Sequence, residues 1–379
     1  MGKRTISGLQ LRGGVWQIDK RVKGYGRLCE STGESERAAA EAYLIRRLEE
    51  IRKAVDLGVH RVPAFREGAT RYLIEYAHLP SIVDAAYHLE LLDKWIGDLP
   101  MDVISDETLR PFKDHRRGEG RKAKTINLSL GYVRRVLNLA ARKWRDPITS
   151  KPLITAAPLI EFAPLADQRP PKPITWKQQR ILLPQLPNRN AAMALFTLNT
   201  GARDTVVCSL RWEWERTHKD IPHSVFVVPK QFVKGRKTER VLVLNRVSQS
   251  VIEAQRGKHP EIVFPYSRRS KGEVPADDMH AVETMNNSAW QKARKEAAKK
   301  DPMLGDLHVH DLRHTVGERL RAAGVSEEDR ADILWHSGGS MTKHYSIARV
   351  SNLMEALDLI AKEPEGAEVP LSELVAVNG

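Results

Sequence analysis

Six residues in the second half of the chain carry side chains that could together cleave a phosphodiester bond. They combine two arginines, a lysine and two histidines with one tyrosine: Arg203, Lys234, His310, Arg313, His336 and Tyr345. Negative charge grows on the phosphate oxygens as a further oxygen attaches to phosphorus, so fixed cationic donors stabilise the transition state more than the ground state. The set therefore predicts DNA strand cleavage by a tyrosine, without a metal ion or another cofactor.

The two arginines suit a phosphate because a guanidinium stays charged and presents a planar fork to two oxygens. Arg203 follows Gly201, which permits a tight turn into the next helix. His310 and Arg313 are three residues apart and therefore share one face of a predicted helix. His314 is one position further along, and we expect it to point elsewhere, as a packing or supporting histidine.

Proton transfer is assigned to a histidine, and a lysine is placed on a hairpin. His310 is expected to accept the tyrosine proton, because an imidazole titrates near neutrality and a phenol at about pH 10. Segment 233–244 has the pattern of a strand, a polar turn and a second strand. Lys234 precedes this turn and is the preferred lysine of the site; Lys237 is the alternative, with Arg236 at the tip.

These motifs, taken in order, resemble those of the tyrosine recombinase or phage integrase family over most of the chain. The resemblance rests on Thr-Gly-Xaa-Arg, a hairpin lysine, His-Xaa-Xaa-Arg-His and a tyrosine in a Thr-Xaa-Xaa-Tyr segment. It implies that Tyr345 attacks the scissile phosphate to form a 3′-phosphotyrosyl link and that Lys234 protonates the departing 5′ oxygen. It also implies that His336 hydrogen-bonds the phosphate or the leaving tyrosine.

Two positions depart from the family pattern. Leu334-Trp335-His336-Ser337 resembles the family's Leu-Gly-His-Ser, with Trp335 in place of the glycine, so the backbone conformation there is open. Val206 stands three residues after Arg203, where the family often carries an acid that supports the site. Asp204 is a candidate to replace that acid, and the supporting role is otherwise open.

The composition of the chain indicates what kind of partner it binds and in which compartment it acts. The 379 residues suffice for two or three domains, and 61 Lys and Arg against 48 Asp and Glu give a formal net charge of +13. This surplus favours a polyanion such as double-stranded DNA. Cys29 and Cys208 match neither a disulfide framework nor a zinc spacing, and no apolar run could span a bilayer. We therefore expect a soluble protein of the bacterial cytoplasm that makes no membrane contact.

The first predicted domain, residues 1–60, is a small α+β module. Residues 9–12 and 15–18 alternate polar and apolar side chains around Gly13-Gly14, which predicts a hairpin, and residues 27–30 predict a third strand. The helix that follows, from about residue 35, is expected to bury Ala38, Ala42, Ile45, Leu48 and Ile51. The module resembles the arm-site DNA-binding domain of larger integrases, which implies DNA contacts by five basic residues: Arg12, Lys20, Arg21, Lys23 and Arg27.

The second predicted domain, residues 64–162, is all helical and resembles the family's core-binding domain, of the SAM-like kind. Its core is expected at Leu89, Leu92, Ile96, Val133, Val136, Leu137 and Ala140. A helix start near Thr125 follows a basic run, and three of its residues could lie on phosphates: Arg121, Lys122 and Lys124. Prolines between residues 163 and 173 mark the next boundary.

The third predicted domain, residues 173–350, is a mainly α catalytic domain with a small antiparallel sheet at about 224–244, the DNA breaking-rejoining enzyme fold. Helices are expected at 175–183, 189–200 and 203–210, and again from the sheet to the C-terminus. The tail, 351–379, places Leu353, Leu357 and Ile360 on one helical face, with a second apolar patch at Leu371, Leu374 and Val375. The helix could pack on its own domain, whereas the family resemblance implies contact with a neighbouring protomer.

The resemblance thus identifies a site-specific recombinase, or integrase, of a phage or mobile element. It implies a homotetramer on DNA, attachment sites of core and arm type, and an accessory DNA-bending or directionality factor. Two alternatives stay open: a type IB topoisomerase, which reseals the same strand, and an architectural DNA-binding protein that has lost activity. The sequence leaves open the attachment-site sequences, the preference for integration or excision, and the oligomeric state off DNA.

Overall fold

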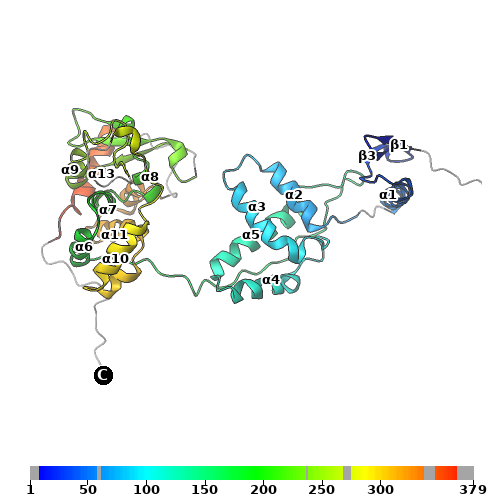
Figure 1. Cartoon of the computed structure of the whole chain (residues 1–379), viewed down its shortest axis with the longest axis horizontal. Coiled ribbons are helices and arrows are strands. Elements are labelled where there is room, and N and C mark those ends of the chain that lie inside the picture. Colours follow the sequence, from blue (N-terminus) through cyan, green and yellow to red (C-terminus); the bar gives the residue numbers. More distant parts are fainter. Residues whose placement is uncertain (1–7, 58–60, 236–237, 268–274, 337–345, 365–379) are drawn as a thin grey trace, which may run out of the picture. The chain divides into compact units, whose positions relative to one another are not determined.

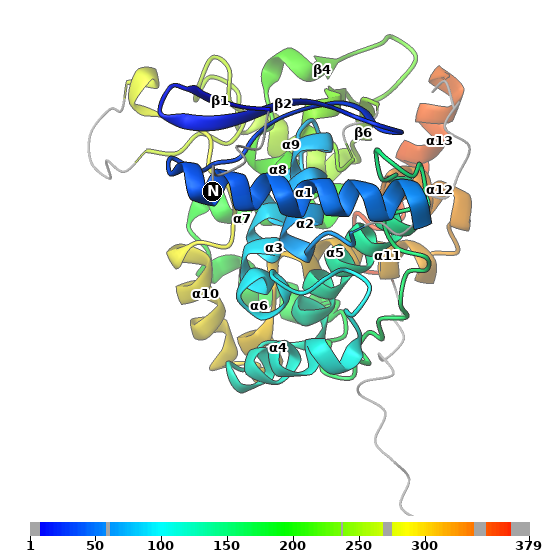
Figure 2. The ribbon, with the colours of Figure 1, turned by 90° about the vertical axis from the view of Figure 1, so that its right-hand side faces the viewer.

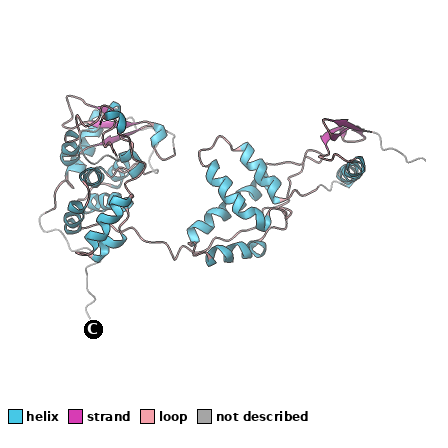
Figure 3. Cartoon of the chain, viewed as in Figure 1, coloured by secondary structure: helices cyan, strands magenta, loops and turns pink. Residues whose placement is uncertain are grey.

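The computed structural model describes residues 8–57, 61–235, 238–267, 275–336 and 346–364 (Figure 1). The chain divides into two compact units, Met1–Arg169 and Pro170–Gly379. This division falls inside the proline-rich stretch at which the sequence predicts a boundary. Strands occur in two small sheets of the described chain, and helices make up the rest of its regular structure (Figure 3). Within the same residues, no helix has both the length and the apolar character needed to cross a bilayer.

The first unit begins with a three-stranded antiparallel sheet and one long helix: β1 (Leu9–Arg12), β2 (Val15–Val22), β3 (Gly26–Ser31) and α1 (Arg37–Leu57). Gly13 and Gly14 both have positive φ, which the two-residue turn between β1 and β2 requires. α1 lies along the sheet (Figure 2), and a small core of Ile18, Leu28, Leu44 and Ile51 joins the two.

The buried face of α1 agrees with the prediction at Ile51 and Leu48, which pack on the sheet, and differs from it nearer the start of the helix. Ala38, Ala42 and Ile45 are exposed, and Ile45 keeps 53% of its surface accessible, whereas Ala40, Leu44, Ile51 and Ala54 are buried. Alanines recur on several sides of this helix, so apolar spacing alone allows two faces. The larger side chains Leu44 and Ile51 decide between them because they bury more apolar area against the sheet.

The helical part of the first unit follows the predicted pattern. Its helices are α2 (Phe65–Glu75), α3 (Ile82–Ile96), α4 (Asp106–Gly118) and α5 (Ala123–Arg142). All seven residues that the sequence places in this core are buried, together with Trp144 and Phe112. α5 begins two residues before Thr125, with Lys122 as its N-cap.

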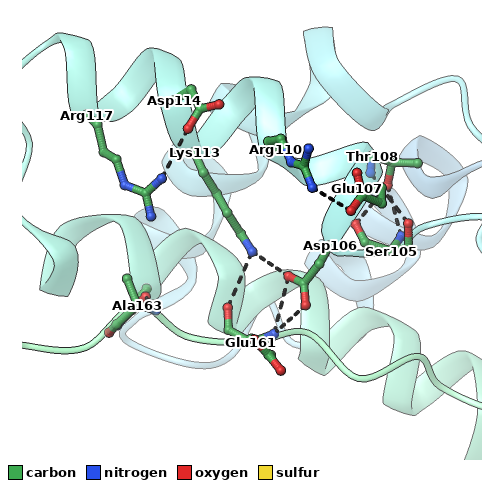
Figure 4. A network of polar contacts seen from close by, with 11 residues as sticks. Ser105, Asp106, Glu107, Thr108, Arg110, Lys113, Asp114, Arg117, Glu161 and Ala163 are labelled. Atoms are coloured by element: carbon green, nitrogen blue, oxygen red, sulfur yellow. Dashed lines mark hydrogen bonds and ion pairs between the residues drawn. The ribbon is translucent and has the colours of Figure 1, made fainter.

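The segment that leaves this helical core is hydrogen-bonded back to it. The Asp106 carboxylate accepts the backbone N–H of Glu161, and Lys113 Nζ donates to both that carboxylate and the Glu161 carbonyl (Figure 4). Asn127 exchanges two hydrogen bonds with the backbone of Ala163, at 2.8 and 2.9 Å. These bonds fix the start of the connection between the units.

The second unit is helical around one small sheet. Its helices are α6 (Trp176–Leu182), α7 (Asn188–Thr200), α8 (Asp204–Cys208), α9 (Arg246–Glu253), α10 (Ser288–Ala298), α11 (Val309–Ala322), α12 (Glu327–Ile333) and α13 (Ile347–Asp358). The strands β4 (Glu215–Arg216), β5 (Val225–Val228) and β6 (Arg240–Val243) form an antiparallel sheet in that order. Within the described residues between α9 and α10 the chain has only a short 3-10 turn and isolated bridges, so the expectation of continuous helices after the sheet is wrong there.

The connection between the units is also anchored at its far end, on α11. The Asp311 carboxylate accepts the backbone N–H of Lys172 at 3.1 Å, and Thr315 Oγ1 accepts that of Ile174 at 2.9 Å. Asp311 and Thr315 are buried. The helix that carries His310 and Arg313 therefore also holds the chain that enters this unit.

α13 packs within its own unit. Leu353, Leu357 and Ile360 are buried in one core with Val316 and Leu320 of α11. The first part of the tail thus packs on its own domain, one of the two expected arrangements, and protomer contact by the tail stays a prediction. The second apolar patch, at Leu371, Leu374 and Val375, lies outside the described residues.

Candidate active site

Arg203 and the turn before it are placed by a glycine at the end of α7. Gly201 has φ +67°, the left-handed conformation that glycine adopts at a helix C-terminus without a Cβ penalty. A Cβ at this position would lie 2.5 Å from Leu334 Cδ2. Gly201 is therefore required both by its backbone angle and by close packing against the turn that follows α12.

Arg313 is buried on α11 and is held by two backbone carbonyls. Its Nη1 donates to Gly201 O and its Nη2 to Leu334 O. These bonds occupy two of the five N–H donors of the guanidinium and fix its plane. Burial, followed by the charge of Arg203, lowers the pKa of Arg313. The guanidinium still carries its charge at neutral pH.

Arg203 is held by the next carbonyl of the same turn. Its Nη2 donates to Trp335 O at 3.4 Å, so consecutive carbonyls, those of Leu334 and Trp335, orient the two arginines. Burial and then the charge of Arg240 lower the pKa of Arg203. Arg240 is the first residue of β6, and its proximity to Arg203 was not foreseen from the sequence.

The sequence left the backbone conformation at position 335 open, because Trp335 stands where the family has a glycine. The φ of Trp335 is +52°, so the backbone keeps the left-handed conformation that favours glycine. For a residue with a Cβ this conformation costs about 1–2 kcal/mol. The side chain offsets that cost, because the residue is only 6% exposed and its Nε1 donates to Val241 O at 3.0 Å.

His310 and His314 lie together, so His314 does not point away from the site as predicted, while its contact with His310 fits the predicted supporting role. Their ring centroids are 4.8 Å apart in an edge-to-face arrangement, as residues four apart on a helix allow. The prediction compared His314 only with Arg313, its immediate neighbour in the sequence. The spacing from His310 was the signal that could have placed His314 at the site.

The histidines of the site favour their neutral forms. Burial, followed by the positive neighbours His314, Arg313 and Arg203, lowers the pKa of His310, and Asp311 opposes the shift. The pKa of His336 is lowered by burial and then by Arg313 and Arg203. Four of the six predicted residues, Arg203, His310, Arg313 and His336, are thus close enough to affect one another's charge.

We expect both histidines of the free protein to titrate below the ordinary value of 6.5. Because the folded-state pKa is the lower one, the stability tied to these groups is present above about pH 6.5 and is lost as the pH falls through the folded-state values. NMR titration of labelled histidine, assigned with His310→Gln and His336→Gln, measures both values. Arg203→Ala should raise them, and a pKa at or above 6.5 in the unaltered protein would contradict this electrostatic account.

Lys234 lies in a turn rather than at the end of a strand. β5 ends at Val228, a 3-10 turn covers Lys230–Phe232, and Lys234 follows it with an exposed side chain. The predicted second strand is present as β6, but the predicted first strand at 233 is not. Arg236 and Lys237 lie outside the described residues, so both candidate lysines remain predictions.

Among the described residues, the candidate supporting acid Asp204 directs its hydrogen bonds to segment 284–285 and to Cys208. Its carboxylate accepts bonds from Thr284 Oγ1 at 2.6 Å and from the Met285 backbone N–H at 2.9 Å. Val206 is buried in the main core. Asp204 therefore fixes α8 to segment 284–285, and the carbonyls of the 334–335 turn orient the arginines.

Tyr345 lies outside the described residues, and its role stays a prediction from the sequence. Ion pairs and hydrogen bonds hold the described residues on either side of it. Arg349 of α13 forms ion pairs with Asp329 and Asp332 of α12, and Ser346 Oγ accepts the Arg349 backbone N–H. α12, which leads into His336, is therefore held against the helix that follows Tyr345.

The basic residues of the first module that are predicted to contact DNA lie on different faces of its sheet or beside its turns. Arg21 and Arg27 pair across β2 and β3 on the face away from Ile18 and Leu28, and Arg27 also forms an ion pair with Asp19 at 2.7 Å. Successive side chains of a strand point to opposite faces, so Lys20 lies on the same face as Ile18. Arg12 and Lys23 are exposed beside turns.

Arg121, Lys122 and Lys124 are exposed at the start of α5. The Ala123 backbone N–H at this helix start donates to the Asp167 carboxylate at 2.7 Å. An acid of the same chain thus occupies one of the N–H donors that the sequence offered to phosphate. No group of three His, Cys, Asp or Glu arranged to hold a metal ion occurs among the residues for which coordinates are described.

Residues 177–351 match the model of the Phage integrase family. The integrase of Salmonella phage P22 is 24% identical over 236 residues, which cover 60% of this chain and 54% of that integrase. The chain thus matches about half the length of this curated relative. A lambda integrase dimer bound to a COC′ core site has a TM-score of 0.51 at 14% identity, over 97% of this chain and 99% of that one. A lambda integrase tetramer bound to a Holliday junction has a TM-score of 0.51 at 13% identity, over 91% and 99%.

The match to the Phage integrase family model covers somewhat less than half of the 379 residues and includes the predicted site residues from Arg203 to Tyr345. The likeness to the lambda integrase structures concerns the fold, a multidomain arrangement of helices and small antiparallel sheets. The predicted fold class is therefore confirmed.

Proposed function

We propose that this protein is a site-specific DNA recombinase, an integrase that cleaves and rejoins DNA through a 3′-phosphotyrosyl intermediate. The observation that carries the proposal is the pair of guanidiniums held by the carbonyls of Leu334 and Trp335, with His310 and His336 beside them. Such donors are oriented before the reaction begins, so little reorganisation is needed when charge develops on a phosphate. The match of residues 177–351 to the Phage integrase family model supports the same conclusion.

In the proposed reaction, Tyr345 Oη attacks the scissile phosphorus and the bond from phosphorus to the 5′ oxygen breaks. His310 takes the phenol proton, for which its neutral form is suited, and Lys234 gives a proton to the 5′ oxygen. Arg203 and Arg313 neutralise the charge that grows on the non-bridging oxygens. In strand exchange, a 5′ hydroxyl of the partner DNA then attacks the phosphotyrosine and releases Tyr345.

Lys234 can be tested by changing the leaving group. A 5′-bridging sulfur leaves without protonation, so a general acid is needed only for the ordinary oxygen. We expect Lys234→Ala to cleave an ordinary strand about a hundredfold more slowly and a 5′-bridging phosphorothioate strand at nearly the original rate. Single-turnover cleavage of both strands measures this. If the phosphorothioate strand restored the cleavage rate of Lys237→Ala and not that of Lys234→Ala, Lys237 would be the general acid.

Strand exchange separates the proposal from its two rivals. The protein is incubated with two duplexes of different length, each with the attachment site, and the products are resolved after protease treatment. A recombinase yields covalent adducts and hybrid duplexes. Adducts that reseal only to their own strand would favour a type IB topoisomerase, and binding without adducts would favour an architectural DNA-binding protein.

The proposed partners are double-stranded DNA and further copies of the chain. Neighbours of this fold have been solved as a dimer on a core site and as a tetramer on a Holliday junction, and we propose a tetramer on DNA by analogy. The formal net charge of +13 supports a polyanionic partner. Free thiols at Cys29 and Cys208 fit a reducing bacterial cytoplasm, where we place the reaction. An accessory bending or directionality factor belongs to the same proposal.

We further propose that residues 1–60 form an arm-binding module, 64–162 a core-binding domain and 173–350 the catalytic domain. The separate cores around Leu44 and around Leu92 support the first division. A second DNA-binding module raises the effective concentration of the enzyme at paired sites without altering its chemistry.

A fragment that begins at Pro63 should still form the covalent adduct on a short core duplex but lose efficient recombination of full sites. Its affinity for core DNA should depend less steeply on salt than that of the whole chain for arm-plus-core DNA, because fewer phosphate contacts release fewer counterions. Binding titrations over a range of salt concentrations measure the slope. Full recombination with an unchanged slope would remove residues 1–60 from DNA binding.

A further inference from the structure

Trp335 connects two parts of the site that are far apart in the sequence. Its carbonyl accepts the Arg203 Nη2 hydrogen, and its indole Nε1 donates to Val241 O on β6. β6 is the last strand in the order β4-β5-β6, so no further described strand of this sheet uses its outward carbonyls. The indole therefore joins the edge of the sheet to the turn that orients both arginines.

We propose that Trp335 is a positioning residue, which holds the β5–β6 hairpin in register with the arginine pair so that the hairpin lysine meets the leaving oxygen. This inference rests on the proposed function and deepens it. Lys234 lies in the connection that leads into β6, and the indole bond is made at Val241, the second residue of that strand. A shift of β6 would move that connection relative to Arg203.

The side chain, rather than the backbone turn, carries this role. A glycine at position 335 would adopt the same positive φ and still offer its carbonyl to Arg203, but it has no group that reaches Val241. The backbone conformation at Trp335 is unfavourable for a residue with a Cβ, yet the tryptophan is buried, with only 6% of its surface exposed. The indole bond is what this residue adds to a turn that glycine could make.

The test uses Trp335→Phe, which keeps an aromatic ring and the backbone carbonyl but removes the indole N–H. Single-turnover cleavage is measured on an ordinary strand and on a 5′-bridging phosphorothioate strand, with the full chain. We expect the ordinary strand to be cleaved about tenfold more slowly and the phosphorothioate strand at nearly the original rate, since only protonation of the leaving oxygen is impaired. The ratio of the two rates does not depend on how much of the variant is folded.

A matched control is available in Trp212, whose Nε1 donates to His259 O at 3.0 Å in the same unit. Trp212→Phe also removes an indole-to-carbonyl bond, and its rate ratio should equal that of the unaltered chain. In the double variant Trp335→Phe/Lys234→Ala, cleavage of the ordinary strand should be no slower than in Lys234→Ala, because both changes act through one group.

Each outcome separates the inference from the function on which it rests. Equal slowing of both strands by Trp335→Phe, or no slowing, would overturn the role of Trp335 and leave the recombinase proposal intact. Rescue in Trp335→Phe without rescue in Lys234→Ala would support the inference and assign the acid to another residue of the hairpin. Failure of the unaltered chain to cleave its attachment site would overturn both.

Discussion

Tyr345→Phe is expected to abolish covalent attachment to DNA while leaving DNA affinity nearly unchanged. The substitution removes one oxygen, the proposed nucleophile, and preserves the ring, so binding contacts are retained. Attachment is measured on a nicked duplex that traps the adduct, and affinity by titration with the same duplex. Tyr266→Phe is a suitable control, because Tyr266 lies in the same unit and its ring stacks with the guanidinium of another arginine, Arg189. Adduct formation at the ordinary rate by Tyr345→Phe would place the nucleophile elsewhere.

Arg203→Ala and Arg313→Ala should each slow cleavage by about a hundredfold or more, the effect expected when a preorganised donor is removed from a developing charge. Arg313→Lys should not restore the rate, since a lysine cannot span the carbonyls of Gly201 and Leu334 and also present a fork to phosphate. Single-turnover cleavage at saturating protein measures the chemical step.

The buried position of Arg313 requires a control for folding. Removing it leaves two buried carbonyls without this partner, at a cost of about 1–3 kcal/mol each. Arg294→Ala provides the comparison, because Arg294 Nη1 also donates to a backbone carbonyl, that of Leu307, at 3.1 Å. Circular dichroism gives the folded fraction of each variant. A loss of less than threefold, after correction for that fraction, would remove the arginine from the site.

Apolar spacing predicted the helical core of the first unit because each of its helices has one clearly apolar face. Leu92 and Leu137, for example, are fully buried as expected. The same reasoning was right for Ile51 of α1 but wrong for Ala38, Ala42 and Ile45, because small alanines on several sides leave the choice of face to the sheet. The hairpin of β1 and β2 followed from Gly13-Gly14, since positive φ at both positions is a local property.

The ordered motifs predicted that Arg203, His310, Arg313 and His336 lie near one another, but not what holds them. Neither the bonds from Arg313 to the carbonyls of Gly201 and Leu334 nor that from Arg203 to Trp335 has a sequence signature, because every residue has a carbonyl. The position of His314 could have been derived from its spacing to His310. That of Arg240 depends on the packing of β6 and could not.

The strongest test of the central claim is to identify the amino acid that becomes linked to DNA. The protein is trapped on a nicked attachment-site duplex, the adduct is digested with nuclease and protease, and the modified peptide is sequenced by mass spectrometry. We expect a phosphodiester between a 3′ nucleotide and the oxygen of Tyr345. A linkage on any other residue, a 5′ linkage, or no covalent adduct on a duplex that the protein binds would contradict it.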